Sequence, residues 1–456
     1  MKRDPHIPAA LQREFADWNL WLTRVVVIGA AACAGLSVVG FTRLTEVAIR
    51  LFSELHALWW WAPLIWTPLL TALIVWATGR YAPGAAGSGI PQVMATLDPA
   101  VDASNRGLFV SLRLSLAKVG LTTGGLLAGL SLGREGPSVQ VAAGVMLAAR
   151  RWLPARSTVH DHGLLVAGGA AGIAAAFNTP LAGVMFAIEE LSRSPEQRSS
   201  GLLIAGIVLA GIVAVSLNGN ATYFGVIRVP EFEAALLLPG LLTAVASGVA
   251  GGLFARLLKV SLEGRLPDRF TRWRRARPVV FAAACGLGIA VIGIATGGAA
   301  FGSGYDATRA MLEGQQSTPM IYFLLKFVAT WLTTWTGVPA GIFAPALSIG
   351  GALGNDIAAL TNYPHAAALI ALGMTGFLAA TTQAPLTAFI IVMEMVDGHS
   401  MVLTLMAAAL IASGISRILC VPLYGALARL QLGRLGPAAP VASAAADGAR
   451  GAAPGR

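Results

Sequence analysis

The sequence predicts an all-α polytopic membrane protein built from two repeats of tilted, broken and re-entrant helices. Three observations support this fold class. The 456-residue chain is 56% hydrophobic and 12% charged, whereas soluble proteins carry roughly 25% charged residues. Long apolar segments recur along the chain, and glycine or proline interrupts several of them. Finally, two motifs return in the same order in the second half of the chain, as internal repeats require.

The apolar segments that we expect to reach membrane depth are 22–41, 58–77, 108–132, 163–191, 201–217, 236–259, 279–296, 320–335, 341–360, 366–393 and 402–423. Three consecutive tryptophans at 59–61 suit the aromatic belt at a membrane interface. Several segments are too short for a full span or contain an internal proline, which favours re-entrant and discontinuous helices over a simple serpentine.

The membrane domain is expected to cover residues 21–430, with one repeat at about 21–218 and the other at about 235–430. Residues 1–20 are polar and should form a short cytoplasmic segment. Residues 431–456 are rich in Ala, Pro and Gly, a composition that predicts a disordered tail.

The net charge of +10 is a matter of orientation in the membrane rather than of nucleic-acid binding. The basic residues gather in short polar stretches near 2–13, 150–156, 264–277 and 429–434, between or beside apolar segments. The positive-inside rule assigns such stretches to the cytoplasm. Both termini should then be cytoplasmic. The first 20 residues lack the apolar core and small-residue cleavage site of a removed signal peptide.

Residues 133–137 read Gly-Arg-Glu-Gly-Pro and lie between strongly apolar stretches. Glu135 is therefore expected at membrane depth, where a carboxylate costs about 2.5–3.5 kcal/mol on insertion scales. Pro137 suits the first turn of a helix, whose N–H groups lack partners and attract anions. Glu135 would compete with an anion for these donors. The alternative is a polar loop in which Glu135 is an ordinary helix cap.

The internal repeat rests on two pairs of motifs. Residues 180–182 (Pro-Leu-Ala), followed by Glu189, resemble residues 385–387 (Pro-Leu-Thr), followed by Glu394; both offsets are 205 residues. The Gly-Arg-Glu-Gly-Pro stretch returns as Gly-Ile-Phe-Ala-Pro at an offset of 208 residues. Matching broken helices point to a site at the repeat interface. Chance similarity of apolar sequence is the alternative. Glu189 and Glu394 are interpreted as structural helix-end acids.

Neither a metal nor a cofactor is expected. The three cysteines are far apart, without metal-ligand spacing or a disulfide framework, and the six histidines fall mostly near span ends. An intramembrane serine protease would need a base close to Ser88 at membrane depth, and no histidine lies well inside an apolar segment. A structural membrane scaffold would not need Glu135 or broken helices. We therefore do not expect an enzyme.

Three motifs together resemble the signature stretches of the CLC family of chloride channels and chloride/proton antiporters. They are residues 87–91 (Gly-Ser-Gly-Ile-Pro), 133–137 (Gly-Arg-Glu-Gly-Pro) and 341–345 (Gly-Ile-Phe-Ala-Pro), and Tyr424 resembles the pore tyrosine of the family. The resemblance implies a homodimer with one pore per subunit, each subunit formed by two inverted halves. It also implies a prokaryotic type without cytoplasmic nucleotide-sensing domains, in the bacterial inner membrane.

The resemblance also implies an anion path made of neutral donors. The residues concerned are Ser88, Tyr424, Ile342, Phe343, Arg134, Gly136 and Ala344. Ser88 and Tyr424 would offer hydroxyl groups, and the others backbone N–H groups. Neutral donors suit conduction because an ion must bind weakly enough to leave again. Ser88 favours chloride over fluoride and nitrate, because the branches that prefer those ions differ from this chain at the serine.

Two carboxylates separate the functional alternatives. By resemblance, Glu135 is the gate and the external proton acceptor, and Glu190 transfers protons on the internal side. These assignments predict a proton-coupled chloride antiporter. The alternative is a passive voltage- or pH-gated chloride channel, because channel members lack a carboxylate at the position of Glu190. Without the resemblance, Glu190 could also be a solvated helix-end acid.

Overall fold

A computed structural model describes residues 17–192, 200–219, 223–225, 234–264, 268–315 and 319–433. Within these ranges the regular structure is helical, apart from two isolated β-bridges. Among the described residues, five helices are long and apolar enough to cross a membrane. The predicted all-α polytopic fold class is confirmed. Residues 431–432 of the predicted disordered tail at 431–456 instead belong to a helix, Leu423–Leu432. The tail from 434 and most of the cytoplasmic segment at 1–20 lie outside the described residues.

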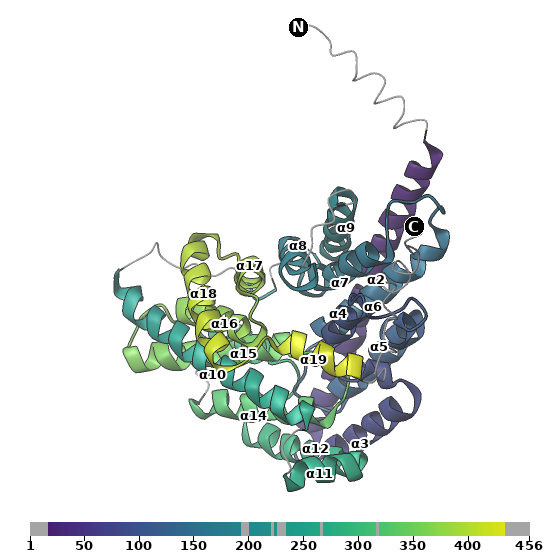
Figure 1. Ribbon diagram of the computed structural model, residues 1–456. Coiled ribbons are helices and arrows are strands. Elements are labelled where there is room, and N and C mark those ends of the chain that lie inside the picture. The colour runs from purple at the N-terminus through teal and green to yellow at the C-terminus, as the bar shows by residue number, and fades with distance from the viewer. Residues whose placement is uncertain are drawn as a thin grey trace, which may run out of the picture.

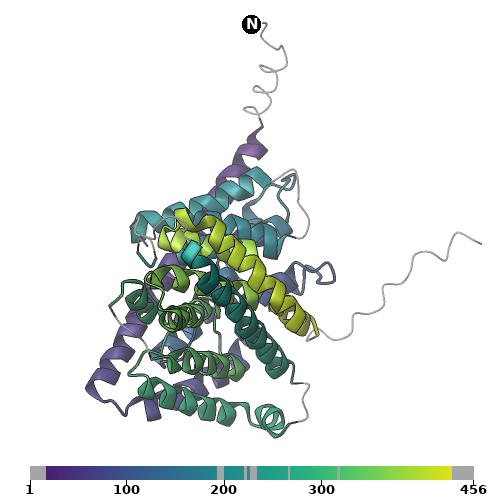
Figure 2. The same ribbon diagram turned by 90° about the vertical axis from the view of Figure 1, so that its left-hand side faces the viewer.

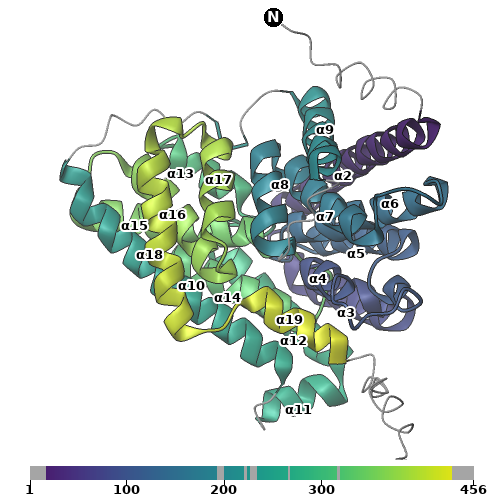
Figure 3. The same cartoon turned by 45° about the horizontal axis from the view of Figure 1, so that its top comes forward.

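The first half of the chain (Figure 1) contains α2 (Trp18–Leu58), α3 (Pro63–Tyr81), α4 (Ile90–Thr96), α5 (Leu112–Leu127), α6 (Glu135–Ala148), α7 (Asp161–Phe177), α8 (Pro180–Phe186) and α9 (Ser200–Asn218). The second half contains α10 (Leu237–Glu263), α11 (Arg269–Ala276), α12 (Pro278–Ala295), α13 (Tyr305–Leu312), α14 (Ile321–Thr336), α15 (Phe343–Thr361), α16 (Ala366–Thr382), α17 (Pro385–Val396), α18 (Val402–Leu419) and α19 (Leu423–Leu432). The two halves lie beside each other, with α8 and α17 in contact at their boundary (Figure 3).

The first predicted span, 22–41, is too short. Helix α2 runs for 41 residues, from Trp18 to Leu58, which corresponds to about 60 Å. The stretch 43–54 is charged, but no proline or glycine interrupts the helix there. Arg43, Glu46 and Arg50 instead lie on the helix and line a cavity.

Two other predicted spans do not form a single continuous helix. The segment 366–393 breaks between α16 and α17 at Gln383, which has a left-handed φ of 62°. The segment 402–423 ends at Leu419, and Tyr424 lies on the separate helix α19. The first half has the matching break between α7 and α8, at Asn178 with φ 61°. The breaks at Asn178 and Gln383 each lie two residues before a proline that starts the next helix, because proline tolerates the first turn but not a helix interior.

The halves are joined by a reciprocal pair of helix caps. The Glu189 carboxylate accepts hydrogen bonds from the N–H groups of Leu386 and Thr387, at 3.0 and 2.7 Å. The Glu394 carboxylate accepts from the N–H groups at the start of α8, at 3.2 and 2.8 Å. The first half thus caps α17 of the second half, and the second half caps α8 of the first. Such a reciprocal arrangement indicates an approximate two-fold axis between the halves. The two repeats that the sequence predicts are therefore related by this approximate axis.

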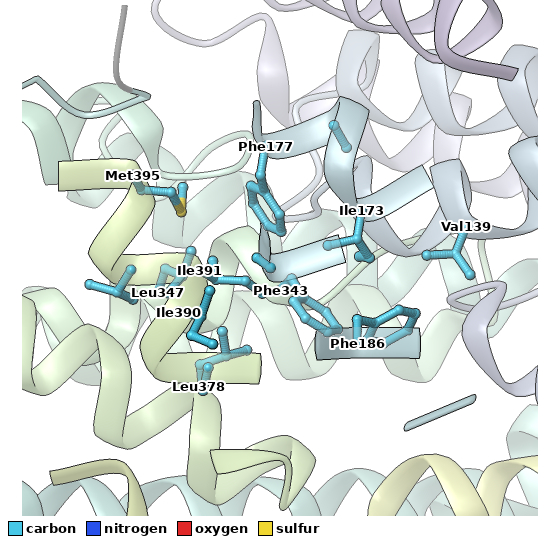
Figure 4. Close-up of a cluster of buried hydrophobic side chains, with 14 of the residues drawn as sticks. Val139, Ile173, Phe177, Phe186, Phe343, Leu347, Leu378, Ile390, Ile391 and Met395 are labelled. Atoms are coloured by element: carbon cyan, nitrogen blue, oxygen red, sulfur yellow. The ribbon is translucent and has the colours of Figure 1, made fainter. Parts of the chain in front are cut away.

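A buried apolar cluster fills the boundary between the halves (Figure 4). Phe343 of α15 lies near Phe177 and Phe186 of the first half, with ring centroids 6.2 and 6.4 Å apart. Farther from this boundary, α10 and α18 pack side by side along their length (Figure 2). The aromatic cluster holds the beginning of α15 in place, and the motif 341–345 lies at that end.

Candidate functional site

Backbone hydrogen bonds join the three motif loops. The N–H of Gly133 donates to the carbonyl of Gly341 at 2.8 Å, and the reverse bond measures 2.9 Å. Gly87 pairs in the same way with the loop before α15, donating to Val338 at 3.2 Å and accepting from Ala340 at 3.1 Å. The first motif and the second motif therefore both meet the third. The sequence predicted that these stretches share one site, and the structure brings them together.

Buried polar side chains hold the glycine-rich loop before α4. Lys118, on α5, is fully buried and donates to the carbonyls of Ala85 and Gly87 at 2.7 and 2.6 Å. Gln140, on α6, donates to the carbonyl of Gly84 at 3.0 Å. A buried cation with carbonyl acceptors is the arrangement expected when charge is removed from water. These contacts hold the loop that carries Ser88 and do not involve the Ser88 hydroxyl.

The loop also depends on two close approaches that only glycine allows. A Cβ at Gly136 would collide with the Ser88 hydroxyl. A Cβ at Gly89 would lie 2.7 Å from the carbonyl oxygen of Gly136, and Gly89 has φ +108°. Glycine supplies both the conformation and the space. The start of α4 and the start of α6 are consequently in direct backbone contact around Ser88.

Glu135 lies at the meeting point of two helix N-termini. It is the first residue of α6, and its side chain is 1% exposed. The first backbone bonds of α6 and α15 are made by Ser138 and Ala346, so the N–H groups before them have no partner within the helix. The N–H groups of Arg134, Glu135 and Ala344 interact with the Glu135 carboxylate. The carboxylate thus occupies a position that suits an anion.

Ser88 and Tyr424 lie together on the other side of this point. Tyr424 is 1% exposed, and its ring stacks on that of Phe343 with centroids 6.0 Å apart. Within the described residues, neither hydroxyl makes a hydrogen bond of ordinary geometry. The two hydroxyls are close enough to interact with each other, but no other group in the described part of the chain satisfies them. Buried hydroxyl groups normally have well-formed partners, so this pair points to a ligand between them. The Phe343 ring positions the tyrosine over the start of α15.

Two cavities approach the site. The Glu135 cavity has a volume of about 620 Å³ and is lined by Glu135 and by residues of α2 and α13, among others. The Ser88 cavity, of about 220 Å³, is lined by Ser88, Tyr424 and Ile342 together with residues of α10, α11 and α19. Of the described residues, none lines both cavities. Glu135 lines one cavity and Ser88 the other, and Gly136, the residue after Glu135, lies close to the Ser88 hydroxyl.

Glu190 does not belong to the described lining of either cavity. It belongs to a short π-helical segment, Ala187–Leu191, that continues α8, and it is half-buried. It is nevertheless close enough to Tyr424 to interact with the phenol electrostatically, as Glu135 also does. The two predicted proton carriers thus lie in the surroundings of one tyrosine, on different elements.

Sequence reasoning missed several residues that shape the site. Lys118 was visible as the one lysine in an apolar segment, but its carbonyl partners are backbone atoms that leave no trace in a sequence. Lys326, 208 residues later, holds the carbonyls of Ala300 and Gly302 at 3.0 and 2.9 Å in the same manner. Residues 302–304 (Gly-Ser-Gly) thereby match residues 87–89, a recurrence that the sequence carries and that a systematic search for repeats could have found.

A membrane protein with two repeats, discontinuous helices meeting at mid-chain loops, and a buried carboxylate between two cavities belongs to the class of ion transporters and channels. A family model described as voltage gated chloride channel matches residues 70–417. The chain therefore belongs to this family, the CLC family, and the predicted membership is confirmed.

Individual relatives and solved structures point to the same family. The chain is 30% identical to the H(+)/Cl(-) exchange transporter ClcA of Citrobacter koseri, over 94% of this chain and 92% of that protein. It is 29% identical to ClcA of Salmonella paratyphi B with the same coverage. The structure of a slow cyanobacterial Cl⁻/H⁺ antiporter superimposes with a TM-score of 0.77 at 26% identity, covering 91% of this chain and 98% of that one. A CLC-type fluoride/proton antiporter, at 21% identity and a TM-score of 0.72, shares the fold.

Proposed function

We infer that the chain is a proton-coupled chloride antiporter, an integral membrane protein that exchanges chloride for protons. The observation that carries this inference is the Glu135 carboxylate, buried where the N-termini of α6 and α15 meet and reached from only one of the two cavities. A group at this place can both block an anion and accept a proton. The two relatives named above are exchange transporters, which favours exchange over a passive channel.

The anion path that we propose runs through the donors around this carboxylate. A chloride would take hydroxyl groups from Ser88 and Tyr424 and backbone N–H groups from Ile342 and Phe343. A second position, using N–H groups of Arg134, Gly136 and Ala344, coincides with the Glu135 carboxylate. Support comes from the two buried hydroxyls, which make no hydrogen bond of ordinary geometry among the described residues, and from the first-turn N–H groups. Because carboxylate and chloride compete for the same donors, one must leave when the other arrives.

The proton path that we propose uses the same carboxylate once it has left that position. Protonation neutralises Glu135, so that it no longer competes as an anion, and it can then carry the proton toward the other side. Glu190 would exchange protons with the internal solution. Its absence from the lining of the Ser88 cavity supports a proton route separate from the chloride route. The electrostatic proximity of both carboxylates to Tyr424 is compatible with a transfer near that residue.

Charge assigns the two cavities to sides of the membrane. Exposed arginines on and after α11, such as Arg272 and Arg277, lie at the Ser88 end, and the positive-inside rule makes that end cytoplasmic. The Glu135 cavity then opens to the outside. We further propose the bacterial inner membrane, cytoplasmic termini, and a homodimer with one pore per subunit. No cofactor or metal is needed in this scheme, because the substrates are chloride and protons.

Flux measurements on purified protein in liposomes test the proposal. Vesicles loaded with chloride are diluted into low chloride, and chloride release is recorded together with the pH of a weakly buffered bath. We expect chloride efflux to drive protons against their gradient. Chloride release without proton movement would make the protein a channel, and no chloride release would refute the proposed substrate.

A further inference from the structure

The Ser88 cavity has one charged side chain among the described residues that line it. Most of the lining is apolar or neutral, as at Leu258, Thr334, Leu427 and Gln431. The exception is Arg274 of α11. Arginine keeps its charge at all accessible pH values and is weakly hydrated for a cation. Anything that enters this cavity toward Ser88 and Tyr424 therefore passes one permanent positive charge.

The fold directs this arginine inward. Asp268 caps the start of α11, its side chain accepting a hydrogen bond from the N–H of Thr271 at 2.5 Å. Arg274 is half-buried and donates from Nη1 to the carbonyl of Ser261, at the end of α10, at 3.3 Å. Its other terminal nitrogen lies 3.8 Å from the place that a Cβ on Gly337 would occupy. The guanidinium is thus held between α10 and the loop that leads to α15.

The same carbonyl anchors a second helix. The indole N–H of Trp335, on α14, donates to the Ser261 carbonyl at 3.1 Å, and the indole N–H of Trp331 donates to the Ser261 hydroxyl at 3.0 Å. Arg274 is therefore positioned by an ordered junction of three helices. The neighbouring Arg272 is exposed and does not line the cavity, which makes it a matched control on the same helix.

How strongly Arg274 and Arg272 attract an anion depends on whether the charge lines the cavity or faces solvent. Exposed charges are screened by salt beyond about 8 Å at physiological ionic strength, while partly buried charges are screened much less. A narrow cavity with apolar walls also focuses the field of a charge at its wall. Arg274 meets both conditions, and Arg272 meets neither. At the binding position itself a full charge would hold an anion too tightly for turnover, but at the cavity wall it can attract an anion and release it inward.

We propose that Arg274 is an anion-recruiting residue of the Ser88 cavity, forming an entry subsite for chloride before the ion reaches Ser88 and Tyr424. The inference rests on the proposed anion path. It adds a residue that sets the affinity for chloride from one side of the membrane without taking part in proton exchange. The residue acts on the ion by its charge, so lysine should replace it better than glutamine.

Membrane vesicles of defined orientation provide the test. Inverted vesicles present the cytoplasmic face to the bath, and right-side-out vesicles present the other face. The KM for chloride uptake is measured in both for wild type, R274Q, R274K and R272Q, after subtraction of the flux in vesicles without the protein. In inverted vesicles R274Q should raise the KM roughly tenfold, and R274K and R272Q should stay within about twofold of wild type. Flux at saturating chloride and the chloride-to-proton ratio should not change.

Right-side-out vesicles should show the same KM for all four proteins. The proposal is overturned if R274Q keeps the wild-type KM in inverted vesicles, if the KM rises equally in both orientations, or if R272Q has the same effect. Should R274Q fail to reach the membrane, Gln431→Glu decides, because it adds a negative charge to the same lining and leaves Arg274 intact. It should raise the KM in inverted vesicles, and an unchanged KM would overturn the proposal. Wild-type chloride flux without proton movement would refute antiport and leave this test intact, because the KM is measured on chloride alone.

Discussion

The two halves of the molecule agree where they build the scaffold and differ where we propose chemistry. Lys118 and Lys326, 208 residues apart, hold matching glycine-rich loops. Glu189 and Glu394 cap each other's neighbouring helices. Glu135, however, corresponds at the same 208-residue offset to Phe343, the first residue of α15.

The second proposed proton carrier breaks the symmetry as well. At the 205-residue offset of the helix caps, Glu190 corresponds to Met395, a buried residue of α17. A duplicated scaffold therefore carries two acidic residues in its first half that have apolar counterparts in its second. The comparison suggests that matched polar residues maintain the fold, and that unmatched ones provide function.

Removing the first unmatched carboxylate should have the largest effect. In Glu135→Gln the side chain can neither compete as an anion nor take up a proton. We expect proton movement to fall to background while chloride still flows, and the response of chloride flux to external pH to be lost. Chloride efflux with a pH electrode, repeated between pH 4.5 and 7.5, measures both. Asp306→Asn is the control, because Asp306 lines the same cavity but is exposed to solvent. Uphill proton transport by Glu135→Gln would contradict the assignment.

Glu190→Gln should abolish proton movement as well, but by a different route. The gate remains intact, so external acid should still accelerate chloride efflux by protonating Glu135. The adjacent Glu189→Gln variant controls for a loss of charge in the same π-helical segment and should keep its chloride-to-proton ratio. If Glu190→Gln still drives protons uphill, Glu190 is not on the pathway.

A third pair of variants tests whether only the first of the two glycine-serine-glycine loops determines anion preference. Ser88→Pro removes a hydroxyl from the proposed anion path, and by resemblance to nitrate-preferring relatives it should shift the preference from chloride toward nitrate. We expect a change of roughly tenfold in the flux ratio, or about 1.4 kcal/mol. Wild type should move chloride well and fluoride poorly. Ser303→Pro changes the matching serine of the second half and should leave the ratio unaltered. Paired-salt efflux assays measure it, and an equal shift in both variants would disprove the distinction between the loops.

The sequence was most informative where backbone chemistry is encoded by residue type. Glycines and prolines at 87–91, 133–137 and 341–345 predicted loops next to helix starts, and the structure joins those loops. The sequence was least informative where a contact depends on which face of a helix a residue occupies. The basic stretch at 264–277 predicted solvated cytoplasmic charge, but which arginine turns inward follows from the start of α11 at Asp268. The partners of Lys118 and Lys326 are carbonyl groups, which every residue has, so no pattern could reveal them.

The matched carboxylates should have the smallest effect on transport, and an effect on stability instead. Glu189→Gln replaces an acceptor of two N–H bonds with an amide that can accept through one oxygen only, and it removes a negative charge from a helix N-terminus. Hydrogen bonds to charged groups contribute about 1.5–3 kcal/mol. Because Glu189 and Glu394 are only partly buried, we expect a loss of about 1–2 kcal/mol in each variant. The reciprocal geometry predicts similar losses for Glu189→Gln and Glu394→Gln, with the chloride-to-proton ratio unchanged in both.

Thermal unfolding in detergent, read from the midpoint temperature against wild type, measures these losses. The control is Glu313→Gln, which removes a surface ion pair with Arg309 and should cost at most about 1 kcal/mol. The two caps are separate contacts on different helices, so the double variant should lose roughly the sum of the single losses. A large loss for one cap and none for the other would mean that the two-fold relation of the backbone does not extend to its energetics. A change in the chloride-to-proton ratio would show that matched residues take part in transport, and the division between scaffold and chemistry would fail.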